Sequence, residues 1–330
     1  MSSSVSKEDI EHAYARIRGS VLKTPVLSST SILPGKTLFF KCECLQHSGS
    51  FKIRGATNFL STLSPEEARR GVVTHSSGNH AAAVALAASV RGVPAHIVIP
   101  DGAPQCKVDR VVQAQVSNLY RCAATVEARE QACHLVQERT GATFVHPYND
   151  PRTIAGQGTI ALEFLDEIPD LDAIIVPISG GGMCSGIAVY AKGFRPSIKI
   201  VAAEPCGVNR VADTAQCKAQ GALTVFPKTE TMADGLQARL GSLTWPIVRD
   251  FVDEVIIVEE DEIEPAMRVL LSELKVVVEP SGAVGLAAAL SKHFARSQLL
   301  QTCQRIGVIL CGGNLDLDVL ARVCHAKQET

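Results

Sequence analysis

Short apolar runs recur along the chain, and several of them end in loops of glycine and serine. Runs rich in valine and isoleucine begin at Leu38, Gly71, Ala95, Ala173, Lys199 and Ile306. Each has the length and composition of a buried strand. Segments with helical spacing lie between several of these runs, at residues 81–91, 126–140 and 154–167. Strands that alternate with helices in this way predict an α/β fold with layers around largely parallel sheets.

The loops after three of these strands contain the sequences SSGN, SGGGM and CGGN. In open α/β sheets, ligands bind beyond the carboxyl ends of the strands, so we expect the three loops to share one crevice. No repeat, low-complexity tract or proline-rich linker marks a domain boundary. A second domain would therefore be an insertion within the first.

Composition narrows the classes of partner and the compartment. A chain of 330 residues with 46% hydrophobic and 20% charged residues can bury a sizeable core and form two domains. The net charge of -2 gives no overall positive electrostatic field that would attract nucleic acid or a membrane surface, so a small-molecule partner is favoured. The eleven cysteines are scattered without Cys-x-x-Cys, which argues against disulfides and structural zinc. The N-terminus lacks an apolar signal core, and the sequence predicts a cytoplasmic protein.

The stretch GSFKIRGA, residues 49–56, places Lys52 between two apolar residues with glycines nearby. One interpretation is a lysine that buries its stem and keeps its amine in water. The other is an amine whose pKa is lowered by burial, so that it forms a Schiff base with an aldehyde. The second interpretation requires a phosphate site nearby.

The stretch ISGGGMCSG, residues 178–186, is a candidate for that phosphate site. Three consecutive glycines between a strand and a helix can turn backbone N–H groups toward an anion at the positive end of the helix dipole. The spacing differs from Gly-x-Gly-x-x-Gly, and no Gly-Lys-Ser/Thr follows, so a single phosphate fits better than a dinucleotide. A tight turn without a ligand is the alternative.

Other polar groups at strand ends have both structural and functional interpretations. In THSSGNHAAA, residues 74–83, Ser77 or Asn79 could cap the following helix, with His75 and His80 as turn or surface residues. The stretch CGGNLD, residues 311–316, could be an ordinary turn after a strand. Glu204 and Asp213 could be solvated carboxylates.

Taken together, these stretches resemble the serine/threonine dehydratase and serine racemase family, pyridoxal-phosphate enzymes built on the fold of the tryptophan synthase β subunit (fold type II). The resemblance runs from TPVLSS near Thr24 through APQCKVD, HPYNDPRTIAGQGTIALE, MADGL and VEPSGAVGLAA to CGGNLD, and within the family it is greatest to plant-type racemases. It implies an α/β fold of two open parallel-sheet layers. A large cofactor-binding domain would comprise residues 1–70 and 150–330, with a small domain inserted at 71–149. A homodimer and closure of the small domain over substrate are also implied.

The resemblance assigns pyridoxal 5'-phosphate as the cofactor and Lys52 as the lysine that forms the Schiff base. Phe51 would lie behind the cofactor ring, and Asn79 would bond the ring hydroxyl. The phosphate would be held by Ser179, Gly180, Gly181, Gly182 and Met183. Cys311 would face the pyridine nitrogen, and a neutral thiol there leaves that nitrogen largely unprotonated.

Ser77 occupies the position at which racemases of the family have a serine and several dehydratases have alanine. Inversion at Cα needs two bases on opposite faces, so Lys52 would remove the proton on one face and Ser77 would deliver one on the other. β-Elimination needs one base and a leaving hydroxyl. The resemblance therefore implies racemisation of serine accompanied by its dehydration to pyruvate and ammonia.

Departures from the family pattern concern the effectors. The family's divalent-cation site combines a glutamate with an aspartate six residues later; Glu204 matches, Arg210 stands at the second position, and a short insertion would bring Asp213 into register. Glu204 and Asp213 are therefore the candidate ligands for Mg²⁺ or Ca²⁺. The lysine with which animal racemases bind ATP aligns with His47, which argues against ATP activation. Arg129 aligns with an arginine near the substrate entrance, or is an exposed helix residue.

Two other functions stay open from the sequence. One is a dehydratase for threonine, serine or 3-hydroxyaspartate with little racemase activity, which Cys311 favours because some dehydratases have cysteine there. The other is a catalytically silent protein that binds a cofactor or an amino acid on the same fold.

Overall fold

The computed structural model describes residues 5–76, 78–103, 105–114 and 118–325. Its larger sheet has the strand order β1-β2-β10-β7-β8-β9. The strands are β1 (Val26–Ser29), β2 (Thr37–Lys41), β7 (Ala173–Pro177), β8 (Lys199–Pro205), β9 (Glu254–Val258) and β10 (Arg305–Ile309). All neighbouring pairs in this sheet are parallel except β1 and β2. This arrangement confirms the prediction of a largely parallel sheet.

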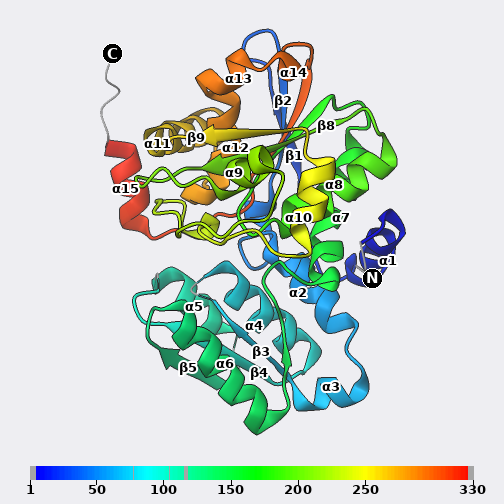
Figure 1. Cartoon of the computed structure of the whole chain (residues 1–330), viewed down its shortest axis with the longest axis vertical. Coiled ribbons are helices and arrows are strands. Elements are labelled where there is room, and N and C mark those ends of the chain that lie inside the picture. Colours follow the sequence, from blue (N-terminus) through cyan, green and yellow to red (C-terminus); the bar gives the residue numbers. More distant parts are fainter. Residues whose placement is uncertain (1–4, 77, 104, 115–117, 326–330) are drawn as a thin grey trace.

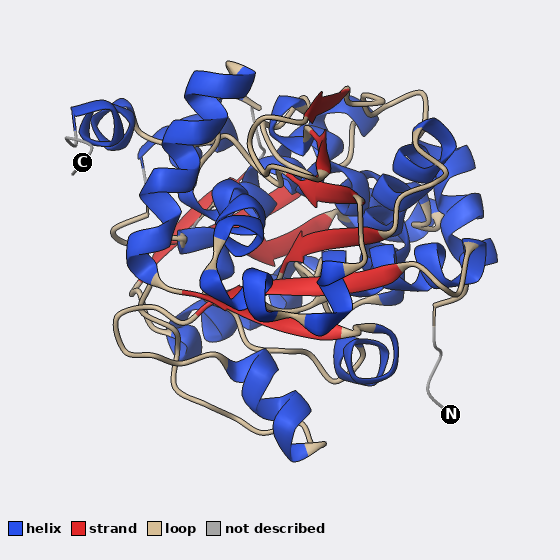
Figure 2. Ribbon diagram, turned by 90° about the horizontal axis from the view of Figure 1, so that it is seen from above, coloured by secondary structure: helices blue, strands red, loops and turns tan. Residues whose placement is uncertain are grey.

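Both faces of the larger sheet are buried under helices, because its strands are apolar on both sides. On β7, Ile174 and Val176 face one core, whereas Ala173 and Ile175 face the other. The first face packs on α1 (Lys7–Ile17), α7 (Pro151–Glu167), α8 (Gly182–Phe194) and α10 (Thr244–Phe251). The second face packs on α11 (Glu260–Val269), α12 (Pro280–Leu290), α13 (Lys292–Arg296) and α15 (Leu317–His325). Figure 2 shows the strands of this sheet between helices on both sides.

A second sheet lies below the first in Figure 1 and has the order β5-β4-β3-β6, with all pairs parallel. Its strands are β3 (Val72–His75), β4 (Ala95–Pro100), β5 (Asn118–Cys122) and β6 (Thr143–Phe144). Three helices cover one face, namely α2 (Lys52–Ser61), α4 (Asn79–Arg91) and α5 (Gln105–Gln113), and α6 (Val126–Thr140) covers the other. All four strands fall within the predicted inserted domain, while α2 lies outside it in sequence. The domain boundaries themselves stay a prediction.

Short helices complete the chain. They are α3 (Pro65–Arg70), α9 (Asp213–Gln220), α14 (Gln298–Gln301), the 3₁₀ helices η1 (Glu43–Leu45) and η2 (Asp234–Leu236), and the π-helix η3 (Leu270–Leu274). In the described ranges, none of the helices is long and apolar enough to cross a membrane.

Candidate active site

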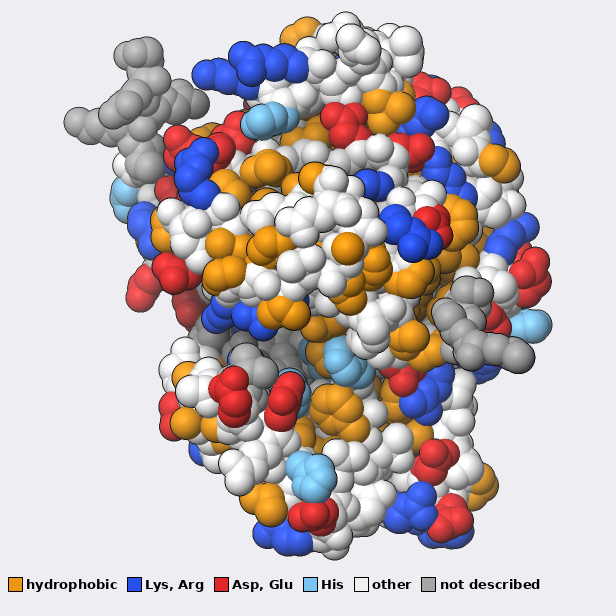
Figure 3. Space-filling model, in the orientation of Figure 1, with side chains coloured by type: hydrophobic (Ala, Val, Ile, Leu, Met, Phe, Trp, Pro, Cys, Tyr) orange, Lys and Arg blue, Asp and Glu red, His pale blue; other side chains and the backbone are white. Residues whose placement is uncertain are grey.

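A cavity of about 680 Å³ lies between the two sheets. Figure 3 shows the molecule hollowed between the two parts that carry these sheets, with histidine side chains visible in the hollow. Residues of all three glycine- and serine-containing loops line this one cavity, among them Asn79, Gly181 and Cys311. The prediction that the three loops share a crevice is therefore confirmed.

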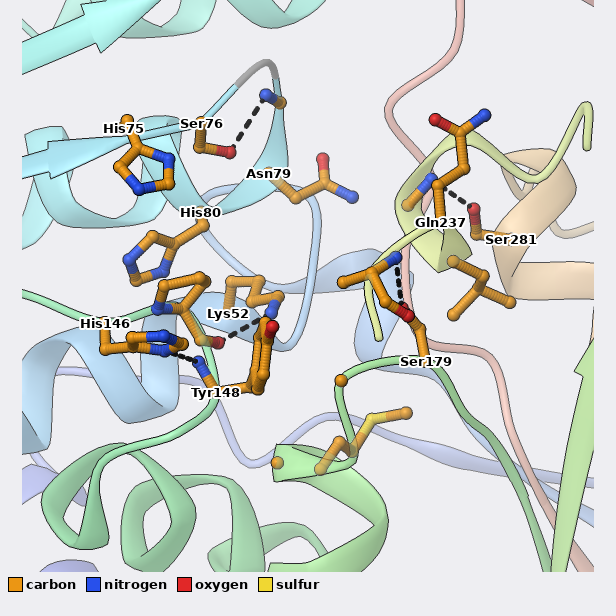
Figure 4. A pocket seen from close by; sticks show the side chains of 18 of the residues that line it. Lys52, His75, Ser76, Asn79, His80, His146, Tyr148, Ser179, Gln237 and Ser281 are labelled. Carbon is orange, nitrogen blue, oxygen red and sulfur yellow. Dashed lines mark hydrogen bonds between the residues drawn. The ribbon is translucent and has the colours of Figure 1, made fainter. Parts of the chain in front are cut away.

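Lys52 begins helix α2, and its side chain enters the cavity (Figure 4). Its Nζ donates a hydrogen bond to the carbonyl oxygen of Pro147 at 2.8 Å and lies 5.0 Å from the centre of the Phe51 ring. Burial lowers the pKa of the Lys52 amine from 10.5 to about 8. The position of the amine inside the cavity favours the second interpretation, that of an amine available to form a Schiff base. A large fraction of this lysine is a neutral nucleophile near pH 8.

Labelling of Lys52 should therefore follow pH differently from labelling of a surface lysine. In protein freed of cofactor, we expect the rate at which an amine-specific reagent modifies Lys52 to rise with a midpoint near pH 8. Peptide mass spectrometry at a series of pH values measures this rate. A midpoint above pH 10, as for an exposed lysine, would contradict the effect of burial.

The glycine loop ends at the N-terminus of α8, where the first N–H groups of the helix have no partner within it. Gly181 has φ +88°, a backbone conformation that favours glycine. A Cβ atom at Gly180 would lie 2.5 Å from the ring of Tyr148, so this position also requires glycine. The loop is thus a cradle of backbone donors beside Lys52 and has the chemistry of a site for one phosphate. The Ser179 hydroxyl, in contrast, is bonded to the backbone of Ala238 at 2.9 and 3.0 Å.

Asn79 is the first residue of α4, which has no side-chain cap, so neither Asn79 nor a neighbour among the described residues caps it. The Asn79 amide is instead held in one orientation. Its Nδ2 donates to Oε1 of Glu279 at 2.5 Å, and its Oδ1 accepts from Nδ2 of Asn314 at 2.8 Å. An amide fixed in this way presents its remaining N–H in a defined direction, as recognition of a ring hydroxyl requires.

Glu279, at the start of α12, contacts both Asn79 and the buried side chain of Lys107. Lys107, on α5, forms ion pairs with Asp234 at 2.6 Å and with Glu279 at 3.2 Å. Burial opposes the charge on Lys107, but the two carboxylates raise its pKa above the ordinary value. Lys107, Asp234 and Glu279 were missed as site residues by the sequence analysis. They occur in the quoted stretches APQCKVD, MADGL and VEPSGAVGLAA, whose chemistry only the folded chain reveals.

Cys311 follows strand β10 and is buried in the cavity wall. Its Sγ donates to the carbonyl oxygen of Ser281 at 3.3 Å. Burial and the nearby Glu279 carboxylate raise the pKa of the Cys311 thiol well above its usual range. The thiol is therefore neutral, as the expected role toward a pyridine nitrogen requires. Phe51 and Met183 also line the cavity.

Three histidines lie on the Lys52 side of the cavity, as Figure 4 shows for His75, His80 and His146. Burial lowers the pKa of His75 and of His146 to about 4, and that of His80 well below its ordinary value. All three imidazoles are therefore neutral at pH 7. His80 is buried and its Nε2 bonds the carbonyl oxygen of Val145 at 3.0 Å, so its interpretation as a turn or surface residue is wrong.

Arg129 lies on α6, is partly buried and lines the cavity. Its place in the cavity lining fits a residue near an entrance, while its hydrogen bond to the Thr125 carbonyl oxygen is exposed. Ser77 lies outside the described residues. Its neighbour Ser76 lines the cavity and accepts a hydrogen bond from the backbone N–H of Gly78 at 3.2 Å.

Glu204 and Asp213 are both buried, so the interpretation as solvated carboxylates is wrong. The Glu204 carboxylate accepts backbone N–H groups of Thr214 and Ala215 at 2.8 and 2.9 Å. Burial, followed by the adjacent Asp213, raises the pKa of Glu204 to about 8. The described residues contain no group of three or more His, Cys, Asp or Glu side chains that could hold a metal ion. Two adjacent buried carboxylates nevertheless have the oxygen donors that suit a hard cation, and binding of a cation would displace the proton that the raised pKa keeps on Glu204.

A cavity with a reactive amine beside a cradle for one phosphate, at the carboxyl ends of parallel strands, defines a class of enzymes that use an aldehyde cofactor with a phosphate group. The model of the family described as "Pyridoxal-phosphate dependent enzyme" matches residues 17–312. The chain belongs to this family.

Relatives within this family are similar over nearly the whole chain. The chain is 56% identical over 313 residues to serine racemase of Oryza sativa, covering 94% of this chain and 91% of the relative. The structure of maize serine racemase superposes with a TM-score of 0.93 at 53% identity, covering 98% and 97% of the two chains. The structure of serine racemase from Dictyostelium discoideum is more distant, at 42% identity and a TM-score of 0.87, and covers 94% and 99%. That of a threonine deaminase from T.th. has 35% identity and a TM-score of 0.86, with the same coverage.

Proposed function

We propose that this protein is a pyridoxal-phosphate serine racemase that interconverts L- and D-serine and also dehydrates serine to pyruvate and ammonia. The observation that carries the proposal is the Lys52 amine, buried in a cavity with the glycine loop and Cys311. The 56% identity to the rice racemase supports the choice of substrate.

The residues of the cavity fit the cofactor from end to end. The backbone of Gly180, Gly181, Gly182 and Met183 would hold its phosphate, with Ser179 fixing the loop to Ala238. Asn79 would bond its ring hydroxyl, Phe51 would lie against its ring, and Cys311 would face its ring nitrogen. When bound, the cofactor withdraws electrons from the substrate and acidifies its Cα proton.

The protein groups then have to move that proton. With a pKa near 8, the Lys52 amine is poised to accept a proton from Cα on its own face and to return it. Racemisation requires a donor on the opposite face, and we assign this role to Ser77. Dehydration needs only the first base and departure of the β-hydroxyl, so the two reactions share Lys52 and differ in their need for Ser77.

Substitution of Ser77 by alanine tests this assignment. We expect Ser77→Ala to lose D-serine formation from L-serine by about 10²-fold or more, as for loss of an acid–base group, while pyruvate formation persists. The two products are quantified separately after incubation with Mg²⁺, with the unmutated protein in parallel. If the unmutated protein forms pyruvate without D-serine, it is a dehydratase and the racemase proposal fails.

A second candidate function is dehydration of threonine, serine or 3-hydroxyaspartate with little racemisation. The observation in its favour is the buried, neutral thiol of Cys311 at the position where some dehydratases have cysteine. The similarity to threonine deaminase is lower than that to the racemases. Product analysis with each hydroxy amino acid distinguishes the two functions.

Glu204 and Asp213 are proposed to bind Mg²⁺ or Ca²⁺, because the two buried carboxylates are adjacent and a cation would replace the proton that Glu204 holds at pH 7. Adding either ion at 100 times its Kd to EDTA-treated protein is expected to raise the free energy of unfolding by about 2.7 kcal/mol, which appears as a higher thermal midpoint. Asp213→Asn should reduce this rise strongly, and K⁺ at matched ionic strength should not produce it. Equal midpoints with and without the divalent ion would exclude the site.

We further propose a cytoplasmic homodimer that ATP does not activate. All eleven cysteines lie in the described part of the chain and are free thiols, which suits a reducing compartment. His47 is exposed and stands where the animal racemases have the lysine that binds the nucleotide. Sedimentation measures the assembly, and turnover with and without ATP tests the effector.

A further inference from the structure

Residues 146–149, His146-Pro147-Tyr148-Asn149, form a turn that connects the second sheet to helix α7 (the 146–149 turn). The turn begins two residues after β6 ends and is followed by Asp150, the N-cap of α7. The His146, Pro147 and Tyr148 residues line the cavity. None of them was singled out by the sequence analysis.

The imidazole of His146 organises the turn from within. Its Nδ1 accepts the backbone N–H of Tyr148 at 3.2 Å and of Asn149 at 2.8 Å. A nitrogen that accepts two N–H groups carries no proton, so His146 is a neutral ring protonated on Nε2. The pair of bonds has the i+2 and i+3 pattern with which an Asn or Asp oxygen closes a turn on its own backbone.

The turn contacts both functional parts of the cavity. The carbonyl oxygen of Pro147 accepts the hydrogen bond from Nζ of Lys52 at 2.8 Å. The ring of Tyr148 lies against Gly180, and its Cα lies 2.8 Å from where a Cβ of Gly182 would be. The turn therefore touches the reactive amine and the phosphate cradle together.

The far end of the turn is anchored on the larger-sheet side of the molecule. Asn149 Oδ1 accepts the backbone N–H of Leu243 at 2.8 Å, and its Nδ2 donates to Oγ of Ser242 at 3.2 Å. At the near end, the His146 carbonyl oxygen accepts from Oγ1 of Thr153 at 3.1 Å. With both ends held, the backbone between them depends on the two bonds to the imidazole.

We propose that His146 is a positioning residue for the active site: its unprotonated Nδ1 fixes the 146–149 turn, which sets both the hydrogen-bond acceptor of Lys52 and the packing of the glycine loop. The proposal rests on the proposed function only in its turnover readout. It assigns to His146 no contact with the substrate and no proton transfer.

The experiment compares His146→Leu with His146→Asn in the full-length protein. Leucine fills space but accepts no hydrogen bond, whereas asparagine supplies an oxygen able to accept the same two N–H groups. Three quantities are measured: the thermal midpoint of cofactor-free protein, the Kd for pyridoxal phosphate by fluorescence titration, and kcat and KM for L-serine. His75→Leu is the matched control, because His75 lines the same cavity but stacks on Phe144 and belongs to no turn closure in the described chain.

For His146→Leu we expect kcat to fall by about 10²-fold, the effect of an ångström-scale misplacement of a catalytic group, with KM changed far less. Its Kd for pyridoxal phosphate should rise by about tenfold, since the cradle loses packing. His146→Asn should recover both quantities to within about threefold of the unmutated protein. His75→Leu should leave the cofactor Kd closer to the unmutated value than His146→Leu does.

Two results would overturn the proposal. If His146→Leu keeps cofactor Kd and kcat near those of the unmutated protein, the turn does not depend on the imidazole. If His146→Asn folds, as its thermal midpoint shows, but is as impaired as His146→Leu, the ring acts through something other than its acceptor nitrogen. Cofactor binding is measured without substrate, so a failure to form D-serine would reject the racemase function and leave this inference standing.

Discussion

Lys52→Ala is expected to reduce both racemisation and dehydration of L-serine by about 10³-fold or more, because one residue supplies the covalent link to the cofactor and the base for both reactions. The amine of Lys52 is inside the cavity, and burial lowers its pKa to about 8. Lys107 also lines the cavity, but it is ion-paired with Asp234 and Glu279 and its pKa is raised, so it does not supply an equivalent neutral amine. The three neighbouring histidines are neutral and very weakly basic, so none of them is expected to take over the role of Lys52 as the base. Turnover and the absorbance of bound cofactor are the measurements.

A matched control for Lys52→Ala is Lys23→Ala, which removes an exposed lysine paired with Asp166. This control should retain turnover and the cofactor absorbance. Methylamine added to Lys52→Ala should restore a part of the activity, because the cavity contains the volume that the side chain vacated. A Lys52→Ala protein with unchanged turnover and absorbance would reject the assignment of the reactive amine, and with it the mechanism.

Glu163→Ala is expected to lower the free energy of unfolding by about 3–5 kcal/mol, the effect of removing one partner from a buried ion network. Glu163, on α7, accepts from Arg54 at 2.7 and 2.9 Å and from Lys41 at 2.8 Å, and all three side chains are buried. Glu43 would be left as the one carboxylate of the network, at 2.7 Å from Arg54. Two buried cations would then share a single anion. Urea denaturation of cofactor-free protein at pH 7 measures the change.

Asp166→Ala provides the control for Glu163→Ala on the same helix. Asp166 pairs with Lys23 at 2.8 Å, but the two side chains are 67% and 49% exposed. An exposed pair of this kind is worth about 0–1 kcal/mol, so the control should unfold close to the unmutated protein. Equal losses in the two variants would show that burial of the Arg54 network does not govern its contribution.

The sequence predicted most of the strands because they are buried on both faces and therefore read as continuous apolar runs. The predicted runs from Ala95 and Lys199 begin at the same residues as β4 and β8. Four described strands were not predicted, namely β1, β5, β6 and β9, although β9 contains an apolar run at residues 255–258. β5 is at a sheet edge with exposed positions and β6 has two residues, so neither forms an apolar run.

For the site, local signals were strong at Lys52 and at the glycine loop, because an enclosed lysine and three consecutive glycines are unusual in a sequence. No local signal marked Glu279, Lys107 or His146. Each of these acts through a partner far away in the chain or through a backbone group, as Lys107 does with Asp234. Side chains of this kind have ordinary neighbours in the sequence, and only the fold brings the partners together.

Strand β10 lies between β2 and β7 in the larger sheet, and its residue Arg305 pairs with Thr37. The centre of the larger sheet is therefore completed by a strand near the end of the chain, which pairs with a strand near its beginning. Contacts of such high order form late, since the entropy of closing the loop is lost before they are made. During synthesis, the chain would expose the unpaired edges of β2 and β7 until residue 309 is available, and Cys311 would join the cavity only then. If the sheet assembles in this order, the chain binds its cofactor only after β10 has paired, so cofactor binding indicates that folding is complete.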